Sequence, residues 1–115
     1  ENIRRAAHGA KILADSGQVV IVALVSPLEA DRAQARQIVG ENFHEVFVDT
    51  PLETCEKRDP KGLYAAARSG KIPEFTGVSA PYEAPVSPEL RLAADRPEHD
   101  AVNTLTAFIL RIVQP

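Results

Sequence analysis

The chain has 115 residues, 44% of them hydrophobic and 25% charged, a composition that predicts one soluble globular domain with a core. Its formal net charge of -3 argues against a nucleic-acid binder, and no apolar run approaches the roughly 18 residues of a membrane span. The single cysteine, Cys55, permits no internal disulfide and favours a reducing cytoplasm, and no signal-like segment opens the chain.

The first predicted element is an amphipathic helix that ends at Gly17. Its apolar residues recur at helical spacings of three and four, with charged residues on the other face. These apolar residues are Ile3, Ala6, Ala7, Ala10, Leu13 and Ala14. Residues 19–25 (VVIVALV) are predicted to form a strand buried on both faces, because the run is β-branched and too short for a free-standing helix.

Two turns are each predicted to start a helix through a capping box. The tetrapeptide at residues 26–29 (SPLE) has the S-x-x-E spacing with proline at the first helical position, and its helix runs to Gly40. The tetrapeptide at residues 50–53 (TPLE) repeats the arrangement. Ser26 is thereby explained as an N-cap. A nucleophilic role for Ser26 is the weaker alternative, because the G-x-S-x-G elbow and a nearby base are both missing.

The remaining elements complete a parallel α/β sheet with helices on both faces. Residues 44–49 (HEVFVD) are predicted to form a second strand, linked to the first by one helix in a right-handed βαβ unit. Leu52 and Cys55 lie on one face of a short helix, and Asp59 opens another helix that stops at Gly70. A proline-rich loop at residues 79–88, an edge strand at 90–92 and a helix at 98–113 follow.

The stretch between Lys57 and Lys71 reverses the charge of the chain. It carries five basic residues against one acid, Asp59, which suits an anionic small ligand. Lys61 stands at a predicted helix start, where a positive charge opposes the helix dipole. The two explanations are a bound anion and a solvated pair with Asp59. Phe75 lies in a loop without an apolar pattern and is expected to stack on a base.

Three ordered blocks carry a resemblance to a known family. They are ENIRR at residues 1–5, VSP at residues 25–27 and RDPKGLYAAARSGKIPEFTG at residues 58–77. Together they resemble adenylylsulfate kinases (APS kinases), the P-loop kinases that phosphorylate the 3′-hydroxyl of adenosine 5′-phosphosulfate in sulfate assimilation. The resemblance implies ATP and adenosine 5′-phosphosulfate as ligands, Mg²⁺ bound with ATP, and in-line transfer of the γ-phosphoryl group. It leaves a homodimer and a fusion to, or association with, ATP sulfurylase open.

The family's Walker A pattern, G-x-x-x-x-G-K-[ST], and the acidic motif after it should precede the first block, and neither occurs in the 115 residues. We therefore expect residues 1–115 to be the C-terminal two-thirds of one APS kinase-like domain of P-loop kinase type. Its first strand-loop-helix unit is missing, and its flap covers about residues 58–88. The Walker strand of the family lies between the strands that correspond to residues 19–25 and 44–49.

The resemblance also implies site roles. Arg58 corresponds to the flap arginine near the adenine of ATP, with Asp59 as its structural partner. Glu74 stands where the family commonly has glycine. Catalytic residues are expected outside these 115 residues, and His44 and His99 have no second ligand at metal spacing, so no protein-held transition metal is expected. The implied substrate contacts are Asn2, Val25, Ser26, Lys61, Glu74 and Phe75.

Two other hypotheses remain open from the sequence. The chain could act as part of another P-loop small-molecule kinase, which specificity for the sulfonucleotide would separate from an APS kinase. It could also be a nucleotide-binding or regulatory fragment without kinase activity, which a turnover measurement would separate from both. On either kinase hypothesis, the 115 residues by themselves are expected to be inactive.

Overall fold

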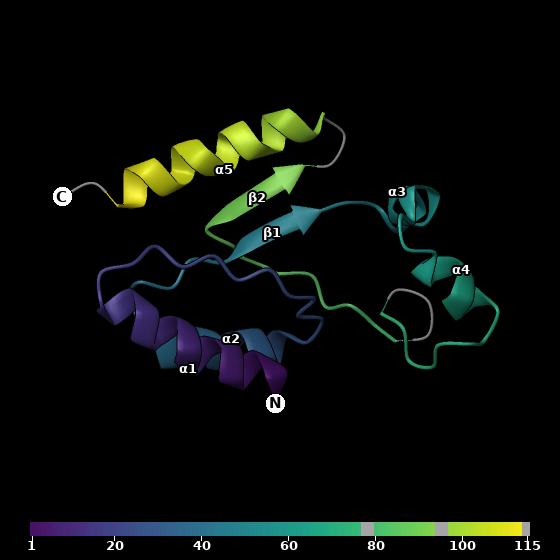
Figure 1. Cartoon of the computed structure of the whole chain (residues 1–115), viewed down its shortest axis with the longest axis horizontal. Helices are drawn as coiled ribbons and strands as arrows, with labels where there is room; N and C mark the ends of the chain where they lie inside the picture. Colours follow the sequence, from purple (N-terminus) through teal and green to yellow (C-terminus); the bar gives the residue numbers. More distant parts are fainter. Residues whose placement is uncertain (77–79, 94–96, 114–115) are drawn as a thin grey trace.

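The computed structural model describes residues 1–76, 80–93 and 97–113. Its helices and strands are interspersed along the chain, as expected for the predicted α/β class (Figure 1). Gly77 and Ser79, at the end of the third sequence block and the start of the proline-rich loop, lie outside the described residues. The elements are α1 (Asn2–Asp15), α2 (Glu29–Val39), β1 (Val46–Asp49), α3 (Leu52–Arg58), α4 (Leu63–Arg68), β2 (Leu90–Ala93) and α5 (Glu98–Ile112).

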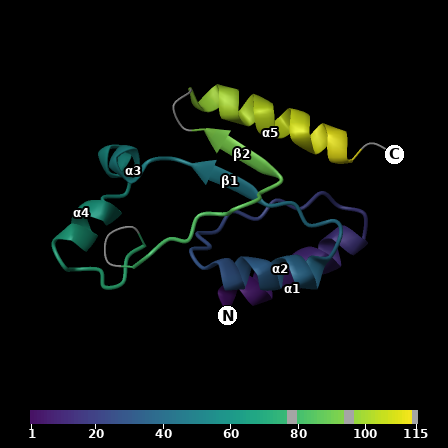
Figure 2. The same cartoon turned by 180° about the vertical axis from the view of Figure 1, so that it is seen from behind.

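The two strands form a parallel pair at the centre of the fold. Val46 of β1 lies opposite Leu90 of β2, and Asp49 lies opposite Ala93. Helix α5 packs against β2, and the packed pair of α1 and α2 lies on the other side of the strands (Figures 1 and 2). The parallel sheet with flanking helices is therefore confirmed, as are strands near residues 44–49 and 90–92.

The strand predicted at residues 19–25 is wrong. Residues 18–28 form no helix or strand, and within the described ranges the sheet consists of β1 and β2 alone. A strand requires a hydrogen-bonded neighbour, whereas a run of β-branched residues indicates only a tendency to be buried. The segment is therefore irregular and leaves five apolar side chains exposed: Val19, Ile21, Val22, Leu24 and Val25. The predicted βαβ unit lacks its first strand for the same reason.

Both predicted capping boxes are also wrong. Helix α2 begins at Glu29 with Leu28 at the N-cap, α3 begins at Leu52 with Pro51 at the N-cap, and neither N-cap side chain makes a capping hydrogen bond. The Glu29 N–H instead donates to Oε1 of Glu83, at 2.7 Å. A carboxylate from a segment distant in sequence satisfies this free helix donor, so the local serine is not needed for it.

The core is small: one buried residue, Ala67, lies on α4, and the others lie where two pairs of elements pack together. Ala7 and Ala35 are buried on α1 and α2, which pack together, and Leu92 and Phe108 are buried on β2 and α5, which pack together. The predicted inner face of α5 is confirmed at Phe108, but Val102, Ile112 and Val113 are exposed. No helix within the described ranges combines the length and apolarity needed to cross a bilayer.

Candidate functional site

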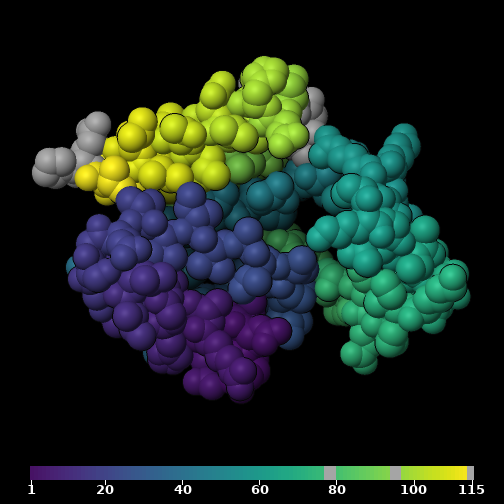
Figure 3. Space-filling view, viewed as in Figure 1, coloured from purple at the N-terminus to yellow at the C-terminus, as the bar shows by residue number. Residues whose placement is uncertain are grey.

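The predicted ligand-binding stretch forms an arm, residues 50–76, that carries α3 and α4. In the described part of the chain, three pairs of elements pack closely: α1 with α2, β1 with β2, and α5 with β2. The arm projects away from these elements (Figure 1), and the surface is hollowed between the arm and the rest of the molecule (Figure 3). The arm is therefore attached mainly through its two ends.

Lys61 lies in the turn between α3 and α4, two residues before the first residue of α4. It is exposed, and no salt bridge involves it within residues 1–76, 80–93 and 97–113. The Asp59 carboxylate instead accepts hydrogen bonds from the N–H groups of Tyr64 and Ala65, at 3.0 and 3.1 Å. Asp59 thus stabilises the start of α4, and the charge of Lys61 is left open to solvent.

Phe75 packs on the arm itself. Its ring meets that of Tyr64 in a T-shaped contact with centroids 5.0 Å apart, and it is half-buried. Burial, with a further contribution from nearby Cys55, raises the pKa of the Tyr64 hydroxyl. Glu74 precedes Phe75 with a φ of 53°, in the left-handed region where a Cβ is strained. Arg58 is the last residue of α3 and is exposed.

The other predicted substrate residues lie on two further segments. Asn2 is the first residue of α1 and is exposed. Val25 and Ser26 lie in the irregular segment before α2, where Val25 is exposed and Ser26 Oγ donates only a long 3.5 Å hydrogen bond to the Leu24 carbonyl. No hydrogen bond or ion pair joins Asn2, Ser26 and Lys61 to one another in the described part of the chain. The structure therefore places the predicted contacts on three separate segments.

A strap, residues 80–89, carries the chain from the arm back to β2 and crosses the start of α2. The Glu83 N–H donates to the Pro27 carbonyl at 2.7 Å. Arg32 of α2 is buried and donates to the carbonyls of Ser26 and Glu83. The sequence reasoning missed both Arg32 and Glu83. On a helical pattern Arg32 belongs to the polar face, and its partners in the strap are about fifty positions away, so no local signal identifies it.

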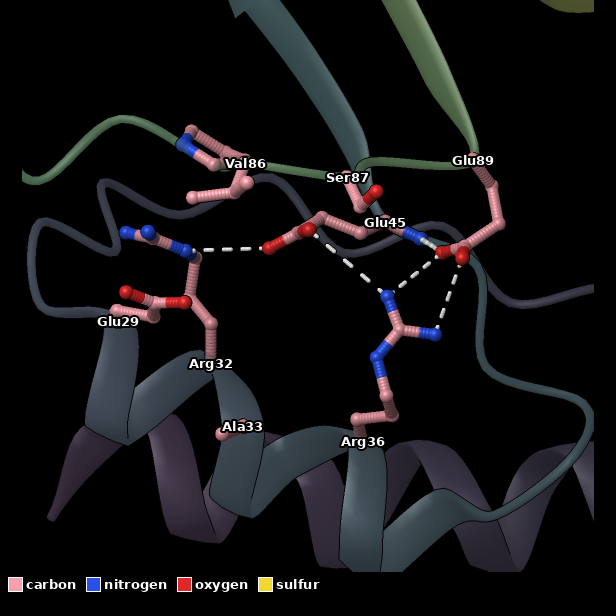
Figure 4. Close-up of a pocket in the computed structure, with 9 residues that line it drawn as sticks. Glu29, Arg32, Ala33, Arg36, Glu45, Val86, Ser87 and Glu89 are labelled. Atoms are coloured by element: carbon pink, nitrogen blue, oxygen red, sulfur yellow. Dashed lines mark hydrogen bonds and ion pairs between the residues drawn. The ribbon is translucent and has the colours of Figure 1, made fainter.

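A cavity of about 420 Å³ lies beside the strap, and two arginines of α2 point into it (Figure 4). Arg32 Nε lies 3.1 Å from Glu45 Oε2, an ion pair without hydrogen-bond geometry. Arg36 makes two hydrogen bonds to the Glu89 carboxylate, at 2.8 and 3.1 Å, and lies 3.8 Å from Glu45 Oε1. The cavity is lined by Glu29, Arg32, Ala33, Arg36, Glu45, Pro85, Val86, Ser87 and Glu89.

The charges in this cavity compensate one another. The hydrogen bonds from Arg36 hold the pKa of Glu89 below its ordinary value, and the Arg36 pKa is raised in turn. Glu89 also accepts the Glu45 N–H at 2.6 Å, which joins the starts of the two strands. The cavity is therefore a structural junction. Separately, no three His, Cys, Asp or Glu side chains within the described ranges are grouped closely enough to hold a metal ion.

The chain is similar to adenylylsulphate kinases. The family model for adenylylsulphate kinase matches residues 1–93. The bifunctional enzyme CysN/CysC of Mycobacterium tuberculosis (strain ATCC 25618 / H37Rv) is 54% identical over 99 residues, which are 84% of this chain and 16% of that protein. The adenylyl-sulfate kinase of Paraburkholderia xenovorans (strain LB400) is 50% identical over 111 residues, which are 96% of this chain and 62% of that protein.

One solved structure has the same fold over most of the chain. It is the structure of the Mycobacterium tuberculosis APS kinase CysC in complex with AMPPNP and APS, which is 49% identical with a TM-score of 0.85. The match covers 93% of this chain and 64% of that one. The chain thus spans less than two-thirds of the length of each of these proteins.

Proposed function

The chain belongs to the adenylylsulphate kinase family, and on that premise we propose that the intact protein transfers the γ-phosphoryl group of ATP to the 3′-hydroxyl of adenosine 5′-phosphosulfate. The products are ADP and 3′-phosphoadenosine 5′-phosphosulfate. The family match over residues 1–93 carries this proposal, because it includes the start of α1, the turn at Ser26 and the whole arm.

The charge of the arm supports an anionic substrate. The described part of the arm offers Lys61 and Arg58 as exposed cations that no carboxylate neutralises there, although the whole chain is acidic. A solvated lysine beside a helix start gains a charge-assisted hydrogen bond when a phosphate or sulfate approaches. We assign Lys61 to the phosphosulfate of the acceptor, and Arg58 to the adenine of ATP, on which a planar guanidinium can stack.

The remaining contacts complete the acceptor site. Phe75 stacks on the acceptor adenine, the backbone at Glu74 lies beside it, and Val25 and Ser26 lie against the adenylyl group, with Asn2 at the phosphosulfate. These residues lie on α1, the Ser26 turn and the arm, so the substrate itself would bring the three segments together. Movement of the arm over the hollow in Figure 3 would exclude water from the bound phosphates.

Mg²⁺ belongs to the same proposal as the ion carried by the ATP phosphates, where it neutralises charge during phosphoryl transfer. Within the described residues, no three His, Cys, Asp or Glu side chains are grouped closely enough to hold the ion. Residues 1–115 bind and orient the acceptor nucleotide and cover the reacting groups.

The division of the domain is part of the proposal. We infer that residues 1–115 are the C-terminal two-thirds of one kinase domain, with the flap at about residues 58–88, and that the rest supplies the phosphate loop and the catalytic groups. Two observations support this: the chain spans 64% of the solved APS kinase, and the apolar segment 19–25 is exposed without a strand partner in the described ranges. A strand from the remainder of the domain would pair with that segment.

Fusion to a sulfurylase partner is supported by the likeness to a bifunctional CysN/CysC enzyme. A homodimer and a cytoplasmic location stay predictions from the sequence.

Turnover by the intact protein tests the proposed function. With MgATP and adenosine 5′-phosphosulfate, chromatography should detect the 3′-phosphorylated product, whereas adenosine 5′-phosphate, which lacks the sulfate, should be a poor acceptor. Equal turnover of other small alcohols would favour a different small-molecule kinase. Absence of any phosphoryl transfer would favour a nucleotide-binding protein without kinase activity, and residues 1–115 alone should not turn over.

A further inference from the structure

Arg32 joins two segments that are far apart in sequence. Its guanidinium donates one hydrogen bond to the carbonyl of Ser26 and another to the carbonyl of Glu83, the second at 2.5 Å. The Arg32 side chain is only 9% exposed, so this cation is held among protein partners. A buried guanidinium fixes the carbonyls that it contacts, because its planar donors have a rigid geometry.

Glu83 holds the same turn from the opposite side. Its N–H donates to the Pro27 carbonyl at 2.7 Å, and its carboxylate accepts the Glu29 N–H at 2.7 Å. Glu83 of the strap therefore pairs directly with two backbone groups of the turn at residues 26–29, the Pro27 carbonyl and the Glu29 N–H. Arg32 binds a third, the Ser26 carbonyl, and links it to the Glu83 carbonyl. The strap in turn is the segment through which the arm returns to β2.

We propose that Arg32 and Glu83 form a clamp that positions the Ser26 turn for the acceptor nucleotide and ties it to the base of the arm. The inference rests on the proposed function for its ligand, but the clamp itself is a property of these contacts. Arg32 is a positioning residue: it acts through the backbone at Ser26 and touches no reacting atom. The clamp fixes the position of the Ser26 turn relative to the strap. The acceptor nucleotide bound at the turn is thereby held in a fixed position relative to the arm.

Arg36 offers a matched control on the same helix. It is one turn further along α2 and is bound to Glu89 and Glu45, yet it contacts neither the Ser26 turn nor Glu83. Both arginines contribute to folding through ion pairs at the same junction (Figure 4). Of these two arginines, only Arg32 contacts the turn. If Arg32 served only to stabilise the fold, substitutions of Arg32 and Arg36 should have the same kinetic effect.

The test compares Arg32→Lys and Arg36→Lys in the intact protein. Lysine keeps the charge but has one donor nitrogen in place of the two fixed nitrogens with which Arg32 binds the two carbonyls. Arg32→Lys should therefore raise the KM for adenosine 5′-phosphosulfate about tenfold, the scale of one charged hydrogen bond. The kcat and the KM for ATP should stay within about twofold, and Arg36→Lys should change none of the three. Equal effects of the two substitutions, or an unchanged acceptor KM in Arg32→Lys, would overturn the clamp.

Glu83 supplies a rescue experiment. Glu83→Ala removes the carboxylate that accepts the Glu29 N–H hydrogen bond. It should raise the KM for adenosine 5′-phosphosulfate as Arg32→Lys does. Glu83→Gln keeps an oxygen at that position and should restore most of the wild-type KM. If Glu83→Gln behaves like Glu83→Ala, the carboxylate does not act through this hydrogen bond and the proposed role of Glu83 is wrong.

Amide hydrogen exchange without nucleotide separates the clamp from the proposed function. Arg32→Lys should speed exchange together in residues 26–29 and in the strap, and Arg36→Lys should leave residues 26–29 protected. Unchanged exchange in Arg32→Lys would overturn the clamp whatever the activity. If the wild type shows no turnover while exchange follows the expected pattern, the proposed function is overturned and the tie between turn and strap is supported.

Discussion

The arm and the junction around α2 are both rich in charge, but they use it differently. At the junction, Arg32 and Arg36 of α2 reach Glu45 and Glu89, which immediately precede β1 and β2, so these ion pairs connect a helix to the sheet (Figure 4). In the arm, the ion pair between Arg68 and Glu56 at 2.5 Å links α4 to α3, and the Tyr64–Phe75 ring contact likewise joins two residues of the arm itself. The junction therefore ties the fold together, whereas the arm holds only its own shape.

This difference has a consequence for function. Long-range contacts at partly buried positions resist local opening, and a segment with local contacts and exposed charges opens at low cost. The arm combines that freedom with the unneutralised charge of Lys61, which is what a segment that closes over an anionic substrate requires. The two arginines of the junction are already paired with Glu45 and Glu89, so the proposed anion contact is assigned to the exposed cations of the arm.

The largest expected effect is at the junction. Glu45→Ala should lower the free energy of unfolding of the intact protein by about 3 kcal/mol, because it leaves the buried Arg32 without its ion-pair partner. Urea denaturation followed by circular dichroism measures the change. The matched substitution in the arm, Glu56→Ala, should hardly move the transition, since its partner Arg68 is exposed. Equal losses would show that the arm is as tightly integrated as the junction.

Lys61→Ala should act on ligand binding and not on stability. Removal of one charge-assisted contact should weaken adenosine 5′-phosphosulfate binding by about 1.5 to 3 kcal/mol and ATP binding by much less. Titration calorimetry with each nucleotide measures both, and Lys57→Ala, an exposed lysine on α3, is the control. An unchanged dissociation constant for adenosine 5′-phosphosulfate would make Lys61 a solvated residue without a substrate role.

Acid should weaken the junction through Glu89. Its pKa is held below the ordinary value of 4.5, chiefly by hydrogen bonds from Arg36, so the unfolded chain binds this proton first as the pH falls. Stabilisation by Glu89 is therefore complete above the ordinary pKa and is lost as the pH falls toward the lower folded value. The difference in unfolding free energy between wild type and Glu89→Gln, at most about 1 kcal/mol, should shrink on acidification.

A double-mutant comparison checks the cause of that pH dependence. In an Arg36→Gln background, Glu89 has lost the main partner that lowers its pKa and keeps only the smaller contribution of the Glu45 N–H, so adding Glu89→Gln should alter the acid dependence of stability much less. A pH dependence that persists unchanged in this background would assign the effect to another carboxyl group.

The smallest expected effect is in the arm, at Glu74. Its φ of 53° strains a residue with a Cβ, and glycine relieves that strain but gains entropy in the unfolded chain, so Glu74→Gly should stabilise by only about 0.5 kcal/mol. Differential scanning calorimetry measures the change. Glu74→Ala keeps the Cβ and should give no gain, and Gly70→Ala, at a φ of 82°, should destabilise. A gain in Glu74→Ala equal to that in Glu74→Gly would exclude backbone strain as the cause.

Local patterns were sufficient for most of the elements. The helical spacing in residues 3–14 predicted α1, and the apolar face around Phe108 predicted α5, because an amphipathic period depends on residues within the same helix. The strands at β1 and β2 were likewise recognised from their apolar runs. The helix starts at Ser26 and Thr50 were predicted at the wrong residues. For α2 the reason is that a distant carboxylate, Glu83, replaces local capping at Glu29.

The sequence by itself determined the family, the α/β class and the concentration of positive charge between Lys57 and Lys71, because each depends on residue identity and order. Only the tertiary structure decided that residues 19–25 lie unpaired in the described fold, and that Arg32 and Glu83 hold the Ser26 turn. The physical reason is the same in both cases. Strand pairing and buried ion contacts are properties of two segments brought together, and the sequence of either segment does not specify its partner.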